Sequence, residues 1–130
     1  MIVLDTHAWL WWASDPDRLS VRAKRAIADA DAIAVSTLSC SEVAMLEARG
    51  RISLDRPAGQ WVRAALRADD RTAAVAPDLD VALAAAQLGE RGFHGDPADR
   101  FIFATAEALD ATLVTRDEAM RRFDRHRTTW

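Results

Sequence analysis

The sequence predicts one α/β domain built on a parallel β-sheet, and three observations support that fold class. Short apolar runs alternate along the chain with longer segments whose apolar residues recur every three or four positions. The first run, Met1–Leu4, is wholly apolar and ends at Asp5, a pattern typical of a buried parallel strand. The 130 residues are 50% hydrophobic and 28% charged, which is the size and composition of one globular domain. We therefore expect residues 1–130 to form a single domain.

Strands are assigned to the short apolar runs and helices to the periodic segments, with boundaries set by capping residues. Ser20, Asp78 and Asp96 are expected N-caps, Pro97 suits a first helical turn, and Gly50 suits a helix C-terminus. In chain order the predicted elements are a strand at 1–4, a helix at 8–13, a helix after 20, a strand at 32–35, a helix at 39–49, an extended piece at 52–54, a helix from 57, a strand at 72–76, a helix after 78, a helix from 96, a strand at 111–114, a short helix ending at 123 and a terminal piece at 126–130.

The first predicted helix carries three tryptophans. Trp9 and Trp12 are three positions apart and share one face, which we expect to be buried. Trp11 falls on another face. We expect it to be exposed and to contact a partner protein, because aromatic side chains dominate protein interfaces.

Bulk charge and cysteine content exclude several function classes. The formal net charge is −3, so any nucleic-acid contact must come from local basic patches rather than from the total charge. Cys40 is the only cysteine, which excludes an internal disulfide and fits a reducing cytoplasm. No apolar run is long enough to span a bilayer, and the N-terminus is a poor signal peptide. The histidines, His7, His94 and His126, lack zinc-ligand spacing.

Three arginines, Arg18, Arg22 and Arg25, form a basic run near the second predicted helix. A solvated helix face is the default interpretation. A track for phosphate groups is the alternative, because the arginine fork binds two oxygens at once.

Four acids occupy equivalent places in the predicted topology. Asp5 ends the first strand, Glu42 lies at the start of the helix after the second strand, Asp99 lies in the first turn of the helix before the fourth strand, and Asp117 follows that strand. Ligands of open α/β sheets collect at the carboxyl ends of the strands. We therefore expect Asp5, Glu42 and Asp117 to meet at that edge, with Asp99 joining them if its helix starts on that side.

The two helical acids also have a structural interpretation. Ser39 and Glu42 match a capping box, and Asp99 is placed where a carboxylate favours the helix dipole. Both acids nevertheless align with apolar helix positions, and helical phase alone leaves the two interpretations open. If the acids do gather, their mutual repulsion predicts a hard divalent cation such as Mg²⁺, which prefers oxygen ligands.

Four segments together carry a resemblance to a known family. LDTHAWLWW contains Asp5, SCSEVAML contains Glu42, GDPADRFIFATA contains Asp99 and LVTRDEAM contains Asp117. In this order and at these spacings they resemble a PIN domain, and specifically the VapC-type toxins of bacterial type II toxin–antitoxin pairs. The resemblance spans essentially the whole chain and implies a single PIN domain, with a twisted parallel β-sheet flanked by α-helices.

The resemblance also implies an activity and its partners. It implies a Mg²⁺-dependent endoribonuclease, with Mn²⁺ as a substitute, that hydrolyses RNA phosphodiester bonds by a metal-activated water. Asp5, Glu42 and Asp99 would be core metal-binding acids, Asp117 a fourth, and Thr115 a supporting hydroxyl. The implied partners are a cognate VapB-type antitoxin, a second copy in a homodimer and an RNA substrate in the cytoplasm, with transfer RNA as the class that the family suggests.

The role of Arg116 has two interpretations, and two other functions are compared with the nuclease. Arg116 adjoins Asp117 and either holds an RNA phosphate or pairs with a surface acid. A non-catalytic PIN-fold module that binds RNA or protein is the alternative function, although such a module has no reason to keep mutually repelling carboxylates. A haloacid-dehalogenase-like phosphohydrolase needs a second Asp two residues after Asp5, where this chain has His7.

Overall fold

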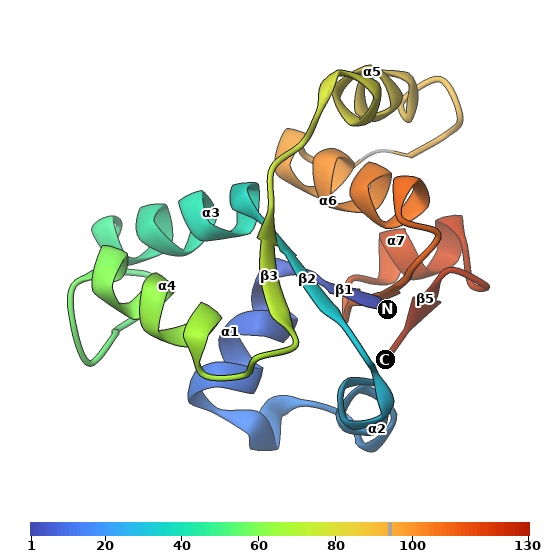
Figure 1. The fold of residues 1–130 in the computed structure, drawn as a ribbon. Helices are drawn as coiled ribbons and strands as arrows, with labels where there is room; N and C mark the ends of the chain where they lie inside the picture. The colour runs from blue at the N-terminus through green and yellow to red at the C-terminus, as the bar shows by residue number, and fades with distance from the viewer. Residues whose placement is uncertain (94) are drawn as a thin grey trace.

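Five parallel strands form one sheet in the computed structural model, which describes residues 1–93 and 95–130 (Figure 1). His94 lies outside the described residues. The strand order is β3-β2-β1-β4-β5. The strands are β1 (Ile2–Leu4), β2 (Ile33–Ser36), β3 (Thr72–Val75), β4 (Thr112–Val114) and β5 (Thr128–Thr129). The predicted parallel α/β fold is thus confirmed.

Helices cover both faces of the sheet, as Figure 1 shows. The helices are α1 (Thr6–Ser14), α2 (Val21–Asp29), α3 (Thr37–Ala48), α4 (Ala58–Arg67), α5 (Leu79–Gln87), α6 (Pro97–Ala108) and α7 (Glu118–Phe123), with a short 3₁₀ turn, η1 (Pro16–Arg18). One hydrophobic core joins the sheet to α1–α4, and a second joins it to α5–α7. Along β1, Ile2 and Leu4 belong to the first core and Val3 to the second, because successive strand residues point to opposite faces.

The central strand β1 is the point where the strand order reverses. From β1 the chain moves outward to β2 and then β3, and it later crosses to β4 on the other side of β1. A crevice forms at the carboxyl ends of the strands at such a switch point, and ligands bind there. The topology therefore places residues that follow β1 and β4, Asp5 and Thr115, beside each other.

Most predicted caps are confirmed, and one is wrong. Ser20, Asp78 and Asp96 cap α2, α5 and α6 through their side-chain oxygens. The helix predicted to open at Ser39 instead begins at Thr37, because the hydroxyl of Ser36 accepts a hydrogen bond from the backbone N–H of Leu38. The capping box predicted for Ser39 and Glu42 therefore does not form, and Glu42 lies in the second turn of α3.

The terminal piece contains a strand that was not predicted, whereas residues 52–54, predicted as a short extended piece, lie outside the helices and strands. Within the terminal piece, Thr128–Thr129 forms the short strand β5, which pairs with β4 at the sheet edge. The chain thereby gains a fifth strand that the sequence pattern did not indicate.

The prediction for Trp11 is wrong. Its side chain is buried, with a fractional exposure of 7%, because Trp130 packs on it at 5.7 Å between ring centroids and the guanidinium of Arg18 lies 4.6 Å from its ring. Trp9 is buried as predicted, and Trp12 is partly buried against the same core. Trp11 is therefore not available to contact a partner protein.

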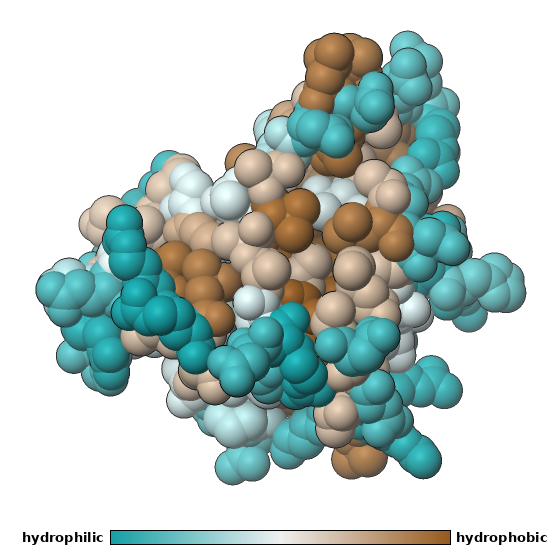
Figure 2. Space-filling view, viewed as in Figure 1, coloured by the Kyte–Doolittle hydropathy of each residue, from teal (hydrophilic) through white to brown (hydrophobic). Residues whose placement is uncertain are grey.

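Exposed apolar surface is found on α5 rather than at Trp11. Figure 2 shows hydrophobic surface over α5, the helix that carries the exposed residues Leu79 and Leu83. Within the described part of the chain, every helix is too short or too polar to cross a lipid bilayer.

Candidate active site

Asp5 is fixed at the carboxyl end of β1 by hydrogen bonds to both of its carboxylate oxygens. Its Oδ1 accepts a bond of 2.7 Å from the backbone N–H of Ala8 and so caps α1. Its Oδ2 accepts a short hydrogen bond from the hydroxyl of Thr115. Burial raises the pKa of Asp5, and these two bonds oppose the rise because they stabilise the charged form. The carboxylate is thus held in one orientation at the edge of the sheet.

Thr115 connects the two strands that flank the crevice. Its buried hydroxyl donates to Asp5 and accepts a bond of 3.0 Å from the backbone N–H of Asp117. Asp117 in turn caps α7, because its Oδ1 accepts a bond of 2.9 Å from the N–H of Met120. One hydroxyl therefore sets the relative positions of Asp5 and Asp117.

Glu42 is positioned by α1 rather than by a cap. Its Oε2 lies 2.7 Å from Oγ1 of Thr6, which also lies 3.1 Å from Oγ of Ser39. A carboxylate only accepts hydrogen bonds, so the single Thr6 proton goes to Glu42 and the Ser39 hydroxyl donates to Thr6. Thr6 was not predicted as a site residue. Its place next to Asp5, and the spacing of Ser39 and Glu42 on one helix face, were the available signals.

Asp99 lies in the first turn of α6, as predicted. The N-cap Asp96 accepts a bond of 2.9 Å from the backbone N–H of Asp99. Among the described residues the Asp99 carboxylate itself has no hydrogen-bond donor. Burial first, and then the neighbouring carboxylates of Asp96, Asp117, Glu42 and Asp5 in that order of effect, together raise the pKa of Asp99 to about 7. Asp99 is thus the acid on which crowding of negative charge acts most strongly.

These side chains line one open cleft with a volume of about 470 Å³. Its lining residues are Asp5, Thr6, His7, Trp11, Glu42, Asp96, Asp99, Arg116 and Asp117. The four acids singled out from the sequence therefore share one cleft, and Thr115 lies beneath it, bonded to Asp5. Arg116 also lines the cleft, with its guanidinium 5.8 Å from the Trp11 ring. Asp96, expected only as a helix cap, adds a fifth carboxylate.

The chemistry of these donors fits a hard cation that keeps part of its water shell. The cleft offers carboxylate and hydroxyl oxygens, which suit Mg²⁺ or Mn²⁺ better than they suit softer metals. Within residues 1–93 and 95–130, no three His, Cys, Asp or Glu side chains lie close enough to ligate one ion together. Such an arrangement fits Mg²⁺, which is usually bound by one or two carboxylates and several waters.

The chain is similar to known proteins along nearly its whole length. The model of the family described as PIN domain matches residues 2–126. Ribonuclease VapC22 of Mycobacterium tuberculosis is 40% identical over 131 residues, which cover 99% of this chain and 98% of that protein.

Solved structures show the same fold at lower identity. A toxin–antitoxin complex from Klebsiella pneumoniae has a TM-score of 0.72 and 20% identity, covering 100% of this chain and 97% of the other. VapC20 of Mycobacterium tuberculosis, described as a sarcin–ricin loop cleaving toxin, has a TM-score of 0.70 and 19% identity, covering 95% of each chain. At such identities these two structures support the fold alone.

Proposed function

Because the chain belongs to the PIN-domain family and is a homologue of the VapC ribonucleases, we propose that it is the toxin of a type II toxin–antitoxin pair that hydrolyses RNA at its acidic cleft. The observation that carries the proposal is the cleft itself. It gathers Asp5, Glu42, Asp99 and Asp117 over a buried hydroxyl, Thr115, that aligns two of them. We further propose that residues 1–130 act as one PIN domain.

Asp5, Glu42, Asp99 and Asp117 are the residues that we propose to hold a Mg²⁺ ion, for which Mn²⁺ can substitute, one or two of them directly and the others through its water molecules. When bound, such an ion supplies a water of lowered pKa and positive charge that stabilises the phosphate in the transition state. Carboxylates alone would repel an RNA phosphate, so the same four side chains give activity only when their charge is compensated.

The remaining residues of the cleft position these acids. Thr115 donates a hydrogen bond to Asp5 and accepts one from the backbone N–H of Asp117, and Thr6 donates to Glu42, so the orientations of the Asp5 and Glu42 carboxylates are fixed. Arg116 is the only arginine or lysine among the described residues that line the cleft. We propose that it binds a phosphate of the substrate, because a guanidinium matches two phosphate oxygens at once.

The proposed partners follow from the same relatives. The neighbours in solved structures include toxin–antitoxin complexes, and we propose a VapB-type antitoxin, a homodimeric toxin and an RNA substrate of the transfer RNA class for this chain. The exposed apolar surface over α5 is typical of a protein contact site and supports a protein partner. Because the proposed substrate is cellular RNA, we propose that the protein acts in the cytoplasm.

Cleavage of cellular RNA tests the proposed function. Antitoxin-free protein is incubated with total RNA in Mg²⁺ or Mn²⁺, and new 5′ ends are mapped with and without EDTA. We expect discrete cuts that leave a 5′-phosphate and that disappear in EDTA. Absence of cutting by folded protein that binds Mn²⁺ would favour the alternative of a non-catalytic binding module.

A further inference from the structure

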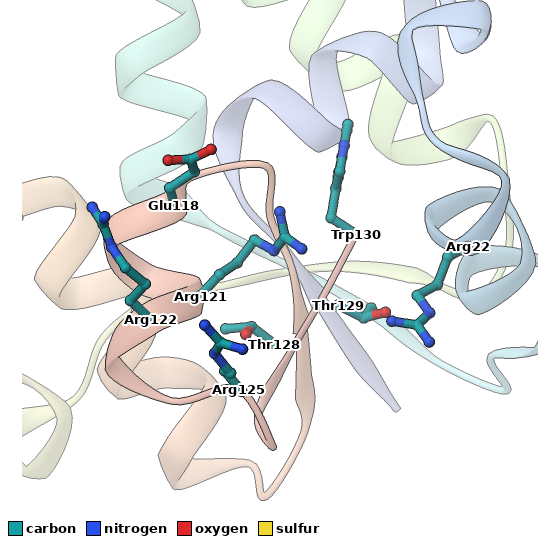
Figure 3. Close-up of a pocket in the computed structure, with 8 residues that line it drawn as sticks. All are labelled: Arg22, Glu118, Arg121, Arg122, Arg125, Thr128, Thr129 and Trp130. Atoms are coloured by element: carbon teal, nitrogen blue, oxygen red, sulfur yellow. The ribbon is translucent and has the colours of Figure 1, made fainter.

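A second groove, of about 400 Å³, lies between α7, the terminal strand β5 and α2 (Figure 3). Its lining residues are Arg22, Glu118, Arg121, Arg122, Arg125, Thr128, Thr129 and Trp130. We call it the arginine groove. In Figure 3 the arginines of α7 and the turn after it lie on one side of β5, and Arg22 of α2 lies on the other. Two segments that are distant in sequence, α2 on one hand and α7 with the turn after it on the other, thus bring their cations to one surface.

The charge of the arginine groove is largely uncompensated. Four guanidinium groups line the groove together with one side-chain carboxylate, that of Glu118. Several arginines elsewhere are paired, for example Arg71 with Asp69 at 2.7 Å and Arg91 with Glu107 at 2.9 Å. Among the described residues, by contrast, no carboxylate lies within ion-pair distance of the four groove arginines. Folding the chain therefore leaves these four charges free for an external anion.

The three arginines of the basic run, Arg18, Arg22 and Arg25, lie in three different environments. Arg18 lies over the ring of Trp11, and Arg25 faces Asp29 at 3.8 Å on the surface of α2. Only Arg22, between them in the sequence, lines the groove. The run is thus neither a uniform solvated face nor a continuous track, and one of its members contributes to a site built by other elements.

The arginine groove adjoins the acidic cleft at two places. Trp11 lines the cleft and Trp130 lines the groove, and their rings are in contact at 5.7 Å between centroids. At the start of α7, Asp117 lines the cleft while Glu118, the next residue, lines the groove. The cleft and the groove therefore lie next to each other, at the contact between Trp11 and Trp130 and at the start of α7.

We propose that the arginine groove binds the phosphodiester backbone of the RNA strand next to the bond that is cut. This inference rests on the proposed function, and it assigns a binding site for the substrate outside the acidic cleft. A polyanion is the ligand that four free guanidinium groups favour, and the hydroxyls of Thr128 and Thr129 add donors for phosphate oxygens.

The arginine groove would offset the repulsion between the acidic cleft and the phosphates of RNA. The cleft gathers five carboxylates and so offers little attraction for RNA beyond a bound cation. The neighbouring arginines supply that attraction at a short distance, where it also fixes the direction of the strand. Contacts to the backbone position a nucleic acid without reading its sequence, so the groove contributes affinity rather than sequence preference.

Binding of a labelled single-stranded RNA in EDTA, across a range of salt concentrations, tests the proposal. The test variant is Arg22→Ala combined with Arg125→Ala, which removes exposed cations from both sides of the groove. The control is Arg63→Ala combined with Arg67→Ala, which removes two exposed arginines from α4 and changes the net charge equally. Thermal unfolding of each variant checks that its fold is intact.

We expect the groove variant to bind roughly tenfold more weakly and to lower the slope of log affinity against log salt by about 1.4, because each lost phosphate contact to a single strand contributes about 0.7. The α4 control should keep the slope of the wild type. Replacement of the same two residues by lysine should restore most of the slope. Equal weakening in the groove variant and the α4 control would overturn the proposal, as would loss of binding to the antitoxin with no change in RNA binding.

The outcome is separable from that of the proposed function. If the wild type cleaves RNA but the groove variant binds it normally, the groove proposal fails and the nuclease stands. If no RNA is cleaved but the groove variant loses RNA binding, the nuclease fails and the groove stands as a nucleic-acid site.

Discussion

Replacement of Asp99 by Asn should stabilise the metal-free protein at neutral and higher pH. The pKa of Asp99 is raised to about 7 from an ordinary value of 3.8, by burial and then by neighbouring carboxylates. The folded state therefore holds this proton more tightly than the unfolded state does. Stability falls as the pH rises from about 4 to about 7, because ionisation costs more in the folded protein. Asn carries no charge and avoids that cost.

The size of the effect follows from the shift in pKa. A shift of about 3 units would correspond to about 4 kcal/mol if the group were fully shielded. Asp99 is partly exposed, so solvent screening reduces the expected cost to about 1–2 kcal/mol. The carboxylate also gains about 0.5 kcal/mol from its place in the first turn of α6, which Asn forfeits. The net gain for Asp99→Asn is then about 1 kcal/mol at pH 8.

Urea unfolding in EDTA at pH 5 and pH 8 measures this gain. A matched control is Asp80→Asn, because Asp80 is an exposed acid in the first turn of α5 and lies outside the cleft. The control should lose a few tenths of a kcal/mol through the helix dipole alone. Asp99→Asn should be stabilised at pH 8 and less so at pH 5. If Asp99→Asn is destabilised at pH 8 to the same extent as Asp80→Asn, the carboxylates do not repel one another and the reasoning is refuted.

Three other outcomes follow from the same geometry. Thr115→Val should destabilise the protein by about 1–3 kcal/mol in urea unfolding and slow RNA cleavage at least tenfold, because it removes the buried hydroxyl that Asp5 accepts from. Normal cleavage by this variant would exclude a positioning role. Gly95→Ala should cost about 1–3 kcal/mol, since its Cβ would lie 2.7 Å from Cζ of the buried Phe93, and an unchanged melting temperature would contradict that contact. Mg²⁺ at 100 times its Kd should stabilise the wild type by about 2.7 kcal/mol and Asp99→Asn by much less. Calorimetry measures both values, and equal stabilisation of the two proteins would show that the ion binds away from Asp99.

The order of elements could be predicted from the sequence because local signals agree with the fold. Apolar runs such as Met1–Leu4 and caps such as Asp96 followed by Pro97 depend on nearby residues only. The start of α3 was predicted wrongly for the opposite reason. Ser36, Thr37 and Ser39 are all suitable residues near a helix start, and the position of Ser39 is set by its contact with Thr6, 33 residues away. A local capping pattern carries no information about such a contact.

The burial of Trp11 and the strand β5 share one cause. The terminal segment pairs with β4 through Thr128–Thr129 and places Trp130 on the ring of Trp11. Helical phase predicts which face a side chain takes but not what covers that face. Two residues are too few to give a strand pattern, so only the folded chain reveals the contact.

The candidate site was predictable at the level of topology. Carboxyl ends of parallel strands meet at one edge, and this rule alone predicts that Asp5 and Asp117 lie together. Helical phase left Glu42 and Asp99 open, and the structure shows both lining the cleft. The arginine groove was not predictable, because its cations come from α2, α7 and the following turn.

The rate of RNA cleavage by Asp5→Asn in Mn²⁺, relative to the wild type and to Asp80→Asn, tests the central claim most directly. Asp5 is held by Thr115 and Ala8 at the floor of the cleft, whereas Asp80 is exposed on α5. We expect discrete cuts from the wild type and from Asp80→Asn, and a loss of at least a hundredfold for Asp5→Asn. Cleavage that persists in folded Asp5→Asn would contradict the assignment of this cleft as the active site.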